Sequence, residues 1–121
     1  MDGYWECNVC GALAKESDGD VPVLFDGAMC ISFSHRSNVR FPPIVGTPER
    51  IMLFDGVHGD GTRSAVLCGS CLRRIGTKTD ADDWSNPHHA GLFFIRTDAV
   101  RFVKCGLVIN DAGVVIESPT R

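Results

Sequence analysis

Six cysteines in a chain of 121 residues are the side chains best suited to chemistry, and four of them form two Cys-x-x-Cys pairs. The pairs are Cys7 with Cys10 and Cys68 with Cys71. Two intervening residues allow a tight backbone turn that directs both sulfur atoms at one ion, and four thiolates complete a tetrahedral Zn²⁺ site. The sequence therefore predicts one structural zinc ion that joins the beginning of the chain to its middle.

Alternatives to zinc stay open. Four-cysteine sites with paired spacing also hold iron, as in rubredoxin-like proteins, although we rank zinc first. Each pair can instead act as a redox dithiol, which requires a Cys-x-x-Cys at a strand-to-helix junction, and the second pair fits that placement better than the first. A disulfide framework is disfavoured because residues 1–6 have neither the basic nor the apolar region of a signal peptide.

The remaining cysteines and the histidines have weaker claims to a functional role. Cys30 and Cys105 lie in apolar runs, where a free cysteine usually packs as a small buried hydrophobe. Neighbouring side chains such as His88 and His89 point apart on a helix or a strand, so we expect an exposed loop pair rather than a second metal site. The isolated His35 is interpreted in the same way.

Composition indicates an ordinary globular chain whose charge is unevenly distributed. Hydrophobic residues make up 44% of the chain, charged residues make up 22%, and the net charge is -3, which argues against disorder. Residues 63–104 contain seven Lys or Arg against four Asp, so the rest of the chain is acidic. Ionised cysteines around a divalent ion would make the protein more acidic still. Its overall field therefore disfavours nucleic acid.

Most of the chain is predicted to form short strands separated by turns. The expected strands are Tyr4–Cys7, Val21–Phe25, Ala28–Phe33, Ile51–Phe54, Arg63–Leu67, Leu92–Arg96, Val100–Cys105, Leu107–Ile109 and Val114–Ile116. The sequence Leu-Phe-Asp-Gly occurs at 24–27 and again at 53–56, each time ending a strand with an Asp-Gly turn signal. Segments 15–20, 41–48 and 58–62 are predicted as loops, the second because three prolines exclude a helix.

One or two short helices complete the prediction. Leu72 and Ile75 are three residues apart and directly follow the second cysteine pair, which favours a short helix opening at that pair. The backbone N–H groups at the start of this helix and the nearby side chains of Arg73 and Arg74 can donate to the thiolates, which would lower their pKa and offset their charge. Residues 80–86 can add one further helical turn.

The cysteine segments resemble a known class of metal-binding domain. Cys-Asn-Val-Cys-Gly at 7–11 and Leu-Cys-Gly-Ser-Cys-Leu at 67–72, the latter leading into a helix, are similar to treble-clef and zinc-ribbon-like four-cysteine zinc-binding domains. The resemblance implies a zinc-organised α+β fold. We therefore expect a small β-rich single domain over 1–121, with zinc knuckles at 7–10 and 68–71, a β-rich insertion at 21–67 and a C-terminal β-hairpin region at 92–118.

No catalytic constellation is recognisable, and we expect the protein not to be an enzyme. The catalytic treble clefs, the His-Asn-His nucleases, place His and Asn around the helix, whereas His58 precedes the second pair and no Asn lies within 71–75. Zinc deaminases need a Pro before the first cysteine and a His-x-Glu upstream, but Leu67 stands at the Pro position and no His-x-Glu exists. Four thiolates also leave no open coordination position.

Our leading interpretation is a small cytoplasmic structural-zinc protein that binds another protein, as an adaptor, an assembly component or a modulator of a larger complex. The C-terminal strands have continuous apolar runs, which indicates that both faces are covered or that one face meets a partner. Self-association is a further possibility. No membrane role is expected, because no apolar run approaches the length of a bilayer span.

The alternative interpretation is a nucleic-acid-binding zinc-finger protein. It requires folding to gather the basic residues of the 63–104 segment on one face. These residues are Arg63, Arg73, Arg74, Lys78, Arg96, Arg101 and Lys104. Trp84 is the only aromatic residue between Arg63 and Leu92, so few bases could stack there. Protein binding therefore ranks first.

Overall fold

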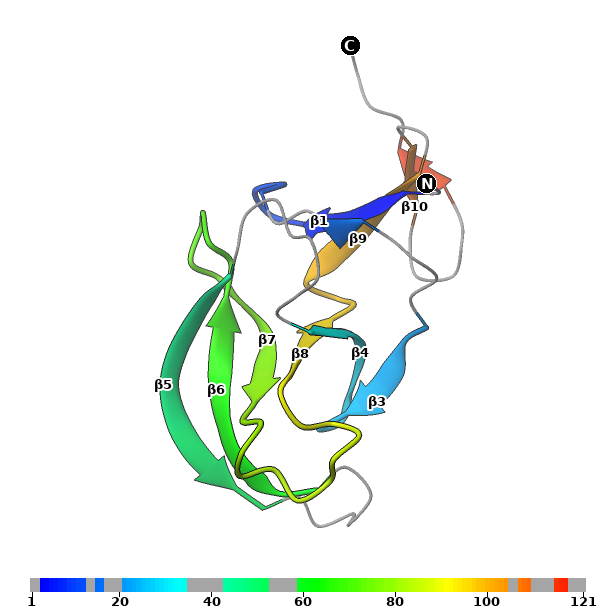
Figure 1. The fold of residues 1–121 in the computed structure, drawn as a ribbon. Helices are drawn as coiled ribbons and strands as arrows, with labels where there is room; N and C mark the ends of the chain where they lie inside the picture. The colour runs from blue at the N-terminus through cyan, green and yellow to red at the C-terminus, as the bar shows by residue number, and fades with distance from the viewer. Residues whose placement is uncertain are drawn as a thin grey trace.

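The fold consists of two antiparallel β-sheets (Figure 1). The computed structural model describes residues 3–12, 15–16, 21–34, 43–52, 59–104, 107–109 and 115–117. Figure 1 shows the smaller sheet, with β1 and β9, lying across one end of the larger one. The chain passes from the larger sheet to the smaller through the turn at 97–99, so this turn lies where the two sheets meet.

The five-stranded sheet has the order β11-β10-β9-β1-β2. Its strands are β1 (Tyr4–Cys7), β2 (Lys15–Glu16), β9 (Val100–Lys104), β10 (Leu107–Ile109) and β11 (Val115–Glu117). The N-terminal strand pairs with a strand from the C-terminal third of the chain, with Cys7 opposite Val100. This pairing fixes the first cysteine pair beside the 97–99 turn.

The six-stranded sheet has the order β3-β4-β8-β7-β6-β5. Its strands are β3 (Val23–Phe25), β4 (Ala28–Ser34), β5 (Ile44–Ile51), β6 (Gly61–Leu67), β7 (Arg74–Thr79) and β8 (Leu92–Arg96). Antiparallel β6 and β7 pair directly, and the residues that connect them include the second cysteine pair. Each cysteine pair therefore belongs to a different sheet.

Most predicted strands are confirmed, among them Tyr4–Cys7 and Leu92–Arg96 with unchanged bounds. The first Asp-Gly turn is also confirmed. Asp26 and Gly27 have φ values of 49° and 76° between β3 and β4, as a two-residue hairpin turn requires. The second Asp-Gly turn, at 53–56, and Cys105 lie outside the described residues. Trp84 packs in the core, with 6% of its surface exposed.

The predicted α+β class is wrong, because the part of the chain that the structure describes is all-β and contains no helix. It accordingly contains no helix able to cross a membrane. At the predicted helix after Cys71, Leu72 has a left-handed backbone, with φ of 64°, and β7 begins at Arg74. Ile75, Thr77 and Thr79 are all buried on this strand. β-Branched residues favour a packed β-strand. This preference outweighed the three-residue spacing of Leu72 and Ile75, which had predicted a helix.

All three predicted loops also contain strand residues, because β6 begins at Gly61 within 58–62. Residues 15–16 form β2, where Lys15 is buried over the Phe33 ring, and 17–20 lie outside the described residues. Within 41–48, β5 begins at Ile44 and includes Pro48. A proline fits here because β5 is an outer strand with a register shift between Val45 and Pro48, so the missing N–H interrupts no central ladder.

The six-stranded sheet carries a separate hydrophobic cluster on each face. One face packs Ile31, Val66 and Ile95 with Cys7 and Cys68, so the first cysteine of each pair belongs to the core between the sheets. The opposite face packs Phe25, Cys30, Trp84 and Phe94. Phe25 and Phe94 stack with ring centroids 4.0 Å apart. Cys30 is therefore a core residue, as the sequence predicts.

Candidate metal centre

The first cysteine knuckle is a turn at the end of β1. Cys7 is the last residue of the strand, and the Gly11 N–H donates to its carbonyl oxygen over 2.8 Å. Gly11 has a φ of 72°, a conformation that glycine adopts without strain. The Asn8 N–H donates to the Ala99 carbonyl at 3.1 Å, and its side-chain amide donates to the Asp98 carbonyl at 2.8 Å. The knuckle is thus anchored to the turn that joins the sheets.

The second knuckle connects β6 and β7 and has the same backbone geometry. The Leu72 N–H donates to the Cys68 carbonyl over 3.0 Å, as Gly11 does to Cys7. The Cys68 N–H donates to the Arg73 carbonyl over 2.8 Å and closes the hairpin. Both knuckles therefore present their two cysteines in the same way, and the second does so on its own hairpin.

The two knuckles bring their four sulfur atoms together. The Sγ atoms of Cys7 and Cys71 are 3.9 Å apart, those of Cys10 and Cys68 are 3.5 Å apart, and all four lie within 4.8 Å of one another. Around a tetrahedral ion with metal–sulfur bonds of about 2.3 Å, neighbouring sulfur atoms are about 3.8 Å apart. The separations far exceed a disulfide bond of about 2.0 Å. The cluster is thus suitable for one metal ion.

Burial divides each pair in the same way. Cys7 and Cys68 have no exposed surface, whereas Cys10 is exposed and Cys71 is half-buried. The first sulfur of each pair thus faces the core and the second faces outward. An ion held by all four would be anchored on its inner side in the hydrophobic cluster that both sheets share.

The surroundings of the sulfur atoms give two of the thiols very different acidities. Burial alone would raise the pKa of Cys68, but hydrogen bonds from the Cys71 and Ser70 backbone and from neighbouring thiols lower it to about 7. For Cys71, the backbone bond from Arg73 lowers the pKa, but burial and the crowding of three other cysteines outweigh it and raise the pKa to about 11. Crowded thiols do not all ionise easily, because the thiolates repel one another. A bound cation would stabilise the thiolate form, which is the form that binds metal.

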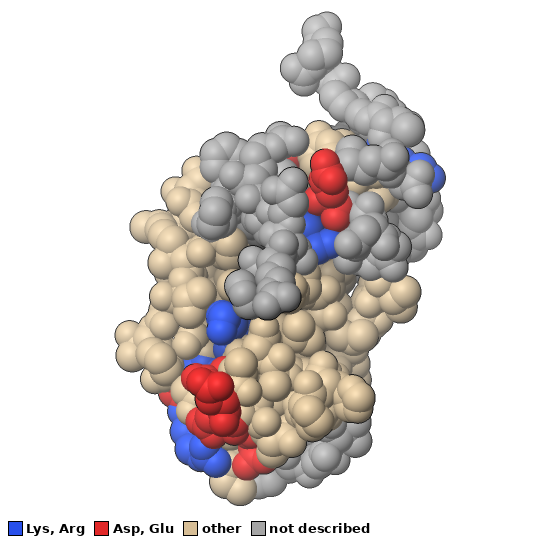
Figure 2. Space-filling model, in the orientation of Figure 1, with Lys and Arg blue, Asp and Glu red and all other residues tan. Residues whose placement is uncertain are grey.

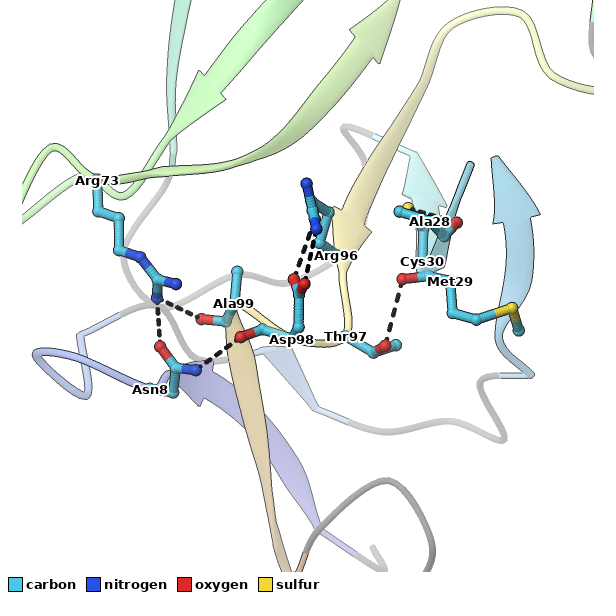
Figure 3. A network of polar contacts seen from close by, with 9 residues as sticks. All are labelled: Asn8, Ala28, Met29, Cys30, Arg73, Arg96, Thr97, Asp98 and Ala99. Atoms are coloured by element: carbon cyan, nitrogen blue, oxygen red, sulfur yellow. Dashed lines mark hydrogen bonds and ion pairs between the residues drawn. The ribbon is translucent and has the colours of Figure 1, made fainter. Parts of the chain in front are cut away.

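The prediction that the Arg73 and Arg74 side chains donate to the thiolates is wrong. Arg73 Nη1 donates to Asn8 Oδ1 and, over 3.4 Å, to the Ala99 carbonyl (Figure 3). Arg74 donates to the Gly76 carbonyl and the Thr77 hydroxyl, both over 3.4 Å. The backbone N–H groups do donate to the sulfur atoms, although from a turn rather than from a helix. The Arg73 side chain instead links the second knuckle to the first.

The seven basic residues proposed as nucleic-acid contacts do not form one surface. Arg63, Arg73, Arg74 and Arg96 line a cavity together. Lys78 lies over the Phe93 ring, on the other face of the sheet from Thr77, and Arg101 pairs with Glu6 over 2.8 Å. Lys104 is exposed at the end of β9. The described residues in Figure 2 show separate basic and acidic patches rather than a continuous basic face.

The histidines within the described residues do not join the cysteine cluster. His88 is exposed, as expected, but His89 is half-buried and its ring packs edge-on against Phe25 and Phe94. His35 and His58 lie outside the described residues. His89 is therefore a packing residue, which two adjacent histidines in a sequence do not reveal.

No protein-family model matches the chain, and neither a curated protein nor a solved structure matches it at a significant level.

Proposed function

We propose that Cys7, Cys10, Cys68 and Cys71 bind one Zn²⁺ in a closed structural site. A set of four thiolates with near-tetrahedral separations is typical of zinc or iron, and zinc needs no redox partner. Backbone N–H groups that donate to Cys68 and Cys71 stabilise the thiolates that either metal requires. Zinc-ribbon-like knuckles fit this arrangement, whereas the treble-clef helix is missing from the described residues.

The proposed metal has a structural rather than a catalytic role. Cys7 and Cys10 lie at the end of β1 in the five-stranded sheet, and Cys68 and Cys71 connect two strands of the six-stranded sheet. One ion would therefore link the two sheets through cysteine pairs that are separated by 57 residues of sequence. Four protein ligands fill a tetrahedral ion, which leaves no position for water or substrate. Reduced thiols are also needed, so we place the protein in the cytoplasm.

The function that we propose for this zinc-stabilised domain is protein binding through the outer strand β3. The two outer strands of the six-stranded sheet differ. β5 carries Pro48 and the charged Glu49 and Arg50, which discourage pairing with another strand. β3 carries none of these, and the exposed Leu24 and Met29 pair across the β3–β4 hairpin.

The partner that suits β3 is an extended, apolar segment of another protein. Such a segment would add a strand to the sheet edge, with backbone hydrogen bonds for affinity and apolar side chains against Leu24 and Met29. Val21, Leu24 and Met29 are 75%, 54% and 46% exposed. The exposure of these three apolar side chains is the single observation that carries the protein-binding proposal. A second copy of the chain is the simplest partner of this kind to test.

Nucleic-acid binding is the second candidate, favoured by the four arginines that line one cavity. It ranks below protein binding because Arg101 is paired with Glu6 and Lys78 lies on the other face. Salt separates the two. Phosphate contacts make affinity fall steeply with ionic strength, whereas an apolar strand edge binds with little salt dependence.

Elemental analysis of the untagged protein tests the metal. We expect one zinc per chain in the wild type, a colourless protein, and loss of the metal in Cys68→Ser. A red protein that contains iron would show that the metal is iron, and the four cysteines would still link the two sheets. A metal-free protein, or one whose metal content is unchanged in Cys68→Ser, would overturn the site and favour the redox dithiols.

Matched variants test the edge strand. Leu24→Glu puts a charge on the β3 edge, and Val45→Glu puts the same charge on β5, where Val45 has similar exposure. We expect Val45→Glu to capture the same partners from cells as the wild type, and Leu24→Glu to lose them. Binding of the purified partner should show the same difference between the two variants. Sedimentation of the isolated chain tests self-association. Equal binding by both variants would contradict a site on β3.

A further inference from the structure

A cavity of about 520 Å³ opens on the face of the six-stranded sheet that carries Thr77 and Phe94. Its volume lies within the range of small-molecule sites. The residues around it come from β3, β4, β6, β7 and β8, from the second knuckle, and from the turns at 26–27 and 97–99. Five of the six strands of this sheet contribute, so strand pairing fixes the shape of the site.

Arginine dominates the charge of this cavity. The guanidinium groups of Arg63, Arg73, Arg74 and Arg96 line it, against two carboxylates, those of Asp26 and Asp98. Guanidinium groups stay charged at every ordinary pH, so the lining is positive by about two charges. A concave wall focuses that potential, although the protein as a whole carries a net charge of -3.

Two of the four arginines are held by carboxylates. Arg63 pairs with Asp26 at 2.5 Å and with Glu49 at 3.2 Å. Arg96 makes two parallel bonds to Asp98, over 3.0 and 2.7 Å (Figure 3). These bonds lower the pKa of Asp98, so this carboxylate stays ionised. Arg63 and Arg96 are therefore fixed, neutralised parts of the wall.

Arg73 and Arg74 make a different set of contacts. Within the described residues their hydrogen bonds go to neutral oxygens, those of Asn8 and Ala99 for Arg73 and those of Gly76 and Thr77 for Arg74. Both bonds of Arg74 are long, at 3.4 Å, so its strongest donors are available for a better acceptor. The charge of Arg73 also lowers the pKa of Asp98, but Asp98 is hydrogen-bonded to Arg96. Among the described residues, no carboxylate therefore hydrogen-bonds Arg73 or Arg74, and two such adjacent cations match a ligand with two negative charges.

The floor of the cavity is neutral and partly apolar. Phe94, Ala28 and Cys30 contribute to it, and Gly76 adds no side chain. Burial raises the pKa of Cys30 to about 11, so its thiol is uncharged and does not repel an anion. The floor can therefore contact the uncharged part of a small ligand while the arginines hold its anionic group.

We propose that this cavity binds a small phosphate monoester, whose dianionic phosphate is held by Arg73 and Arg74 and whose organic part lies toward Phe94. A guanidinium fork suits phosphate oxygens, and a monoester carries close to two charges at neutral pH. A nucleic-acid backbone carries one charge per phosphate and needs an open basic track, which the paired Arg101 and the distant Lys78 do not provide. The proposal is independent of the partner that binds β3.

Calorimetric titration of the metal-loaded full chain tests this site, with phenyl phosphate, inorganic phosphate and a short single-stranded oligonucleotide as probes. We expect saturable 1:1 binding of phenyl phosphate that inorganic phosphate displaces. Arg74→Gln should weaken it about tenfold to a hundredfold, as expected for hydrogen bonds to a charged group. Arg50→Gln removes the same charge from an exposed position on β5 and should leave the affinity unchanged.

Each remaining outcome decides the proposal. No saturable binding of phenyl phosphate, or an equal loss in Arg50→Gln, would overturn the cavity as the site. Tighter, steeply salt-dependent binding of the oligonucleotide would replace it by a nucleic-acid surface. If inorganic phosphate bound as tightly as phenyl phosphate, the organic part would add no affinity, and the proposed contact with Phe94 would be contradicted. Thr77→Val, which removes a buried hydroxyl from the lining, serves as the second variant if Arg74→Gln unfolds.

Discussion

The two cysteine knuckles share a backbone geometry but differ at the residue that constrains it most. The residue after the second cysteine has a φ of 72° in the first knuckle and 64° in the second. That residue is Gly11 in one and Leu72 in the other. A side chain in this conformation costs about 1–2 kcal/mol. The comparison shows that directing two sulfur atoms at one point dictates the turn, whatever the local preference of the residue.

The knuckles also differ in what holds them. The first depends on segments far along the chain, because Asn8 bonds to Asp98 and Ala99. The second is closed by its own hairpin through the Cys68 N–H and the Arg73 carbonyl. We therefore infer that the second knuckle forms with its hairpin, while the first requires the two sheets to have met. The metal would then join the second knuckle, which forms locally, to the first knuckle, which depends on contacts between distant segments.

Loss of a cysteine should have the largest effect, and the two pairs offer a buried and an exposed ligand. Cys68→Ser and Cys10→Ser each remove one ligand, and each should lower the free energy of unfolding by several kcal/mol through loss of metal. The serine introduced by Cys68→Ser would also bury a hydroxyl in the apolar cluster, which costs about 1–3 kcal/mol more. Thermal melts should therefore rank Cys68→Ser below Cys10→Ser, with the wild type highest.

A strong chelator separates the two contributions. With metal removed, Cys10→Ser should melt with the wild type because Cys10 is exposed, while Cys68→Ser should still melt lower. If Cys10→Ser matched the wild type without a chelator, Cys10 would not be a ligand.

A leucine in place of Gly11 would make the first knuckle resemble the second. A Cβ there meets no atom closer than 3.8 Å, so no clash adds to the backbone cost of about 1–2 kcal/mol. Leucine also restricts the unfolded chain, which offsets about 0.5–1 kcal/mol, so we expect a net loss of about 0.5–1 kcal/mol in denaturant unfolding. Gly27→Leu is the matched control, because Gly27 has a φ of 76° with open space around it and lies in a hairpin without metal ligands. Chelator competition should show weaker zinc binding in Gly11→Leu alone. Equal zinc affinity in both variants would contradict the coupling of turn to metal.

The first knuckle was predictable from sequence, and the exit of the second was not. The strand Tyr4–Cys7 follows from local signals, and the structure confirms it. The glycine after Cys10 is also a local signal, because glycine readily takes the positive φ that Gly11 has in this turn. After Cys71 the same local reasoning predicted a helix, since Leu72 carries no sign of a left-handed backbone. Pairing of β7 with β6 and β8 decided that segment, and pairing between distant strands cannot be read from a short stretch of sequence.

The arginine-lined cavity was even harder to predict from the sequence. Arg63, Arg73, Arg74 and Arg96 are spread over 34 positions and only strand order brings them to one face. The basic 63–104 segment did indicate the right stretch of chain. Arg96 pairs with Asp98 within that stretch, but the partners of Arg63 and Arg101 are Asp26, Glu49 and Glu6, which lie outside it.

A double-mutant cycle tests the link between the knuckles. Arg73→Gln and Asn8→Ala each break the bond that joins them, and Asn8→Ala also frees the Asp98 carbonyl. We expect losses of about 1 kcal/mol each in denaturant unfolding, with a coupling of about 0.5–1 kcal/mol. Additive losses would show that the knuckles are braced independently.

Leu72→Gly should have the smallest effect and the opposite sign. Glycine relieves the left-handed backbone, worth about 1–2 kcal/mol, but adds freedom to the unfolded chain worth about 0.5–1 kcal/mol, so a gain of about 0.5–1 kcal/mol remains. Little packing is lost because Leu72 is 58% exposed. Leu72→Asn, which tolerates the same backbone, should give part of the gain. A loss of stability in both variants would mean that the leucine side chain makes contacts stronger than the strain it causes, and the two knuckles would then differ in packing as well as in backbone cost.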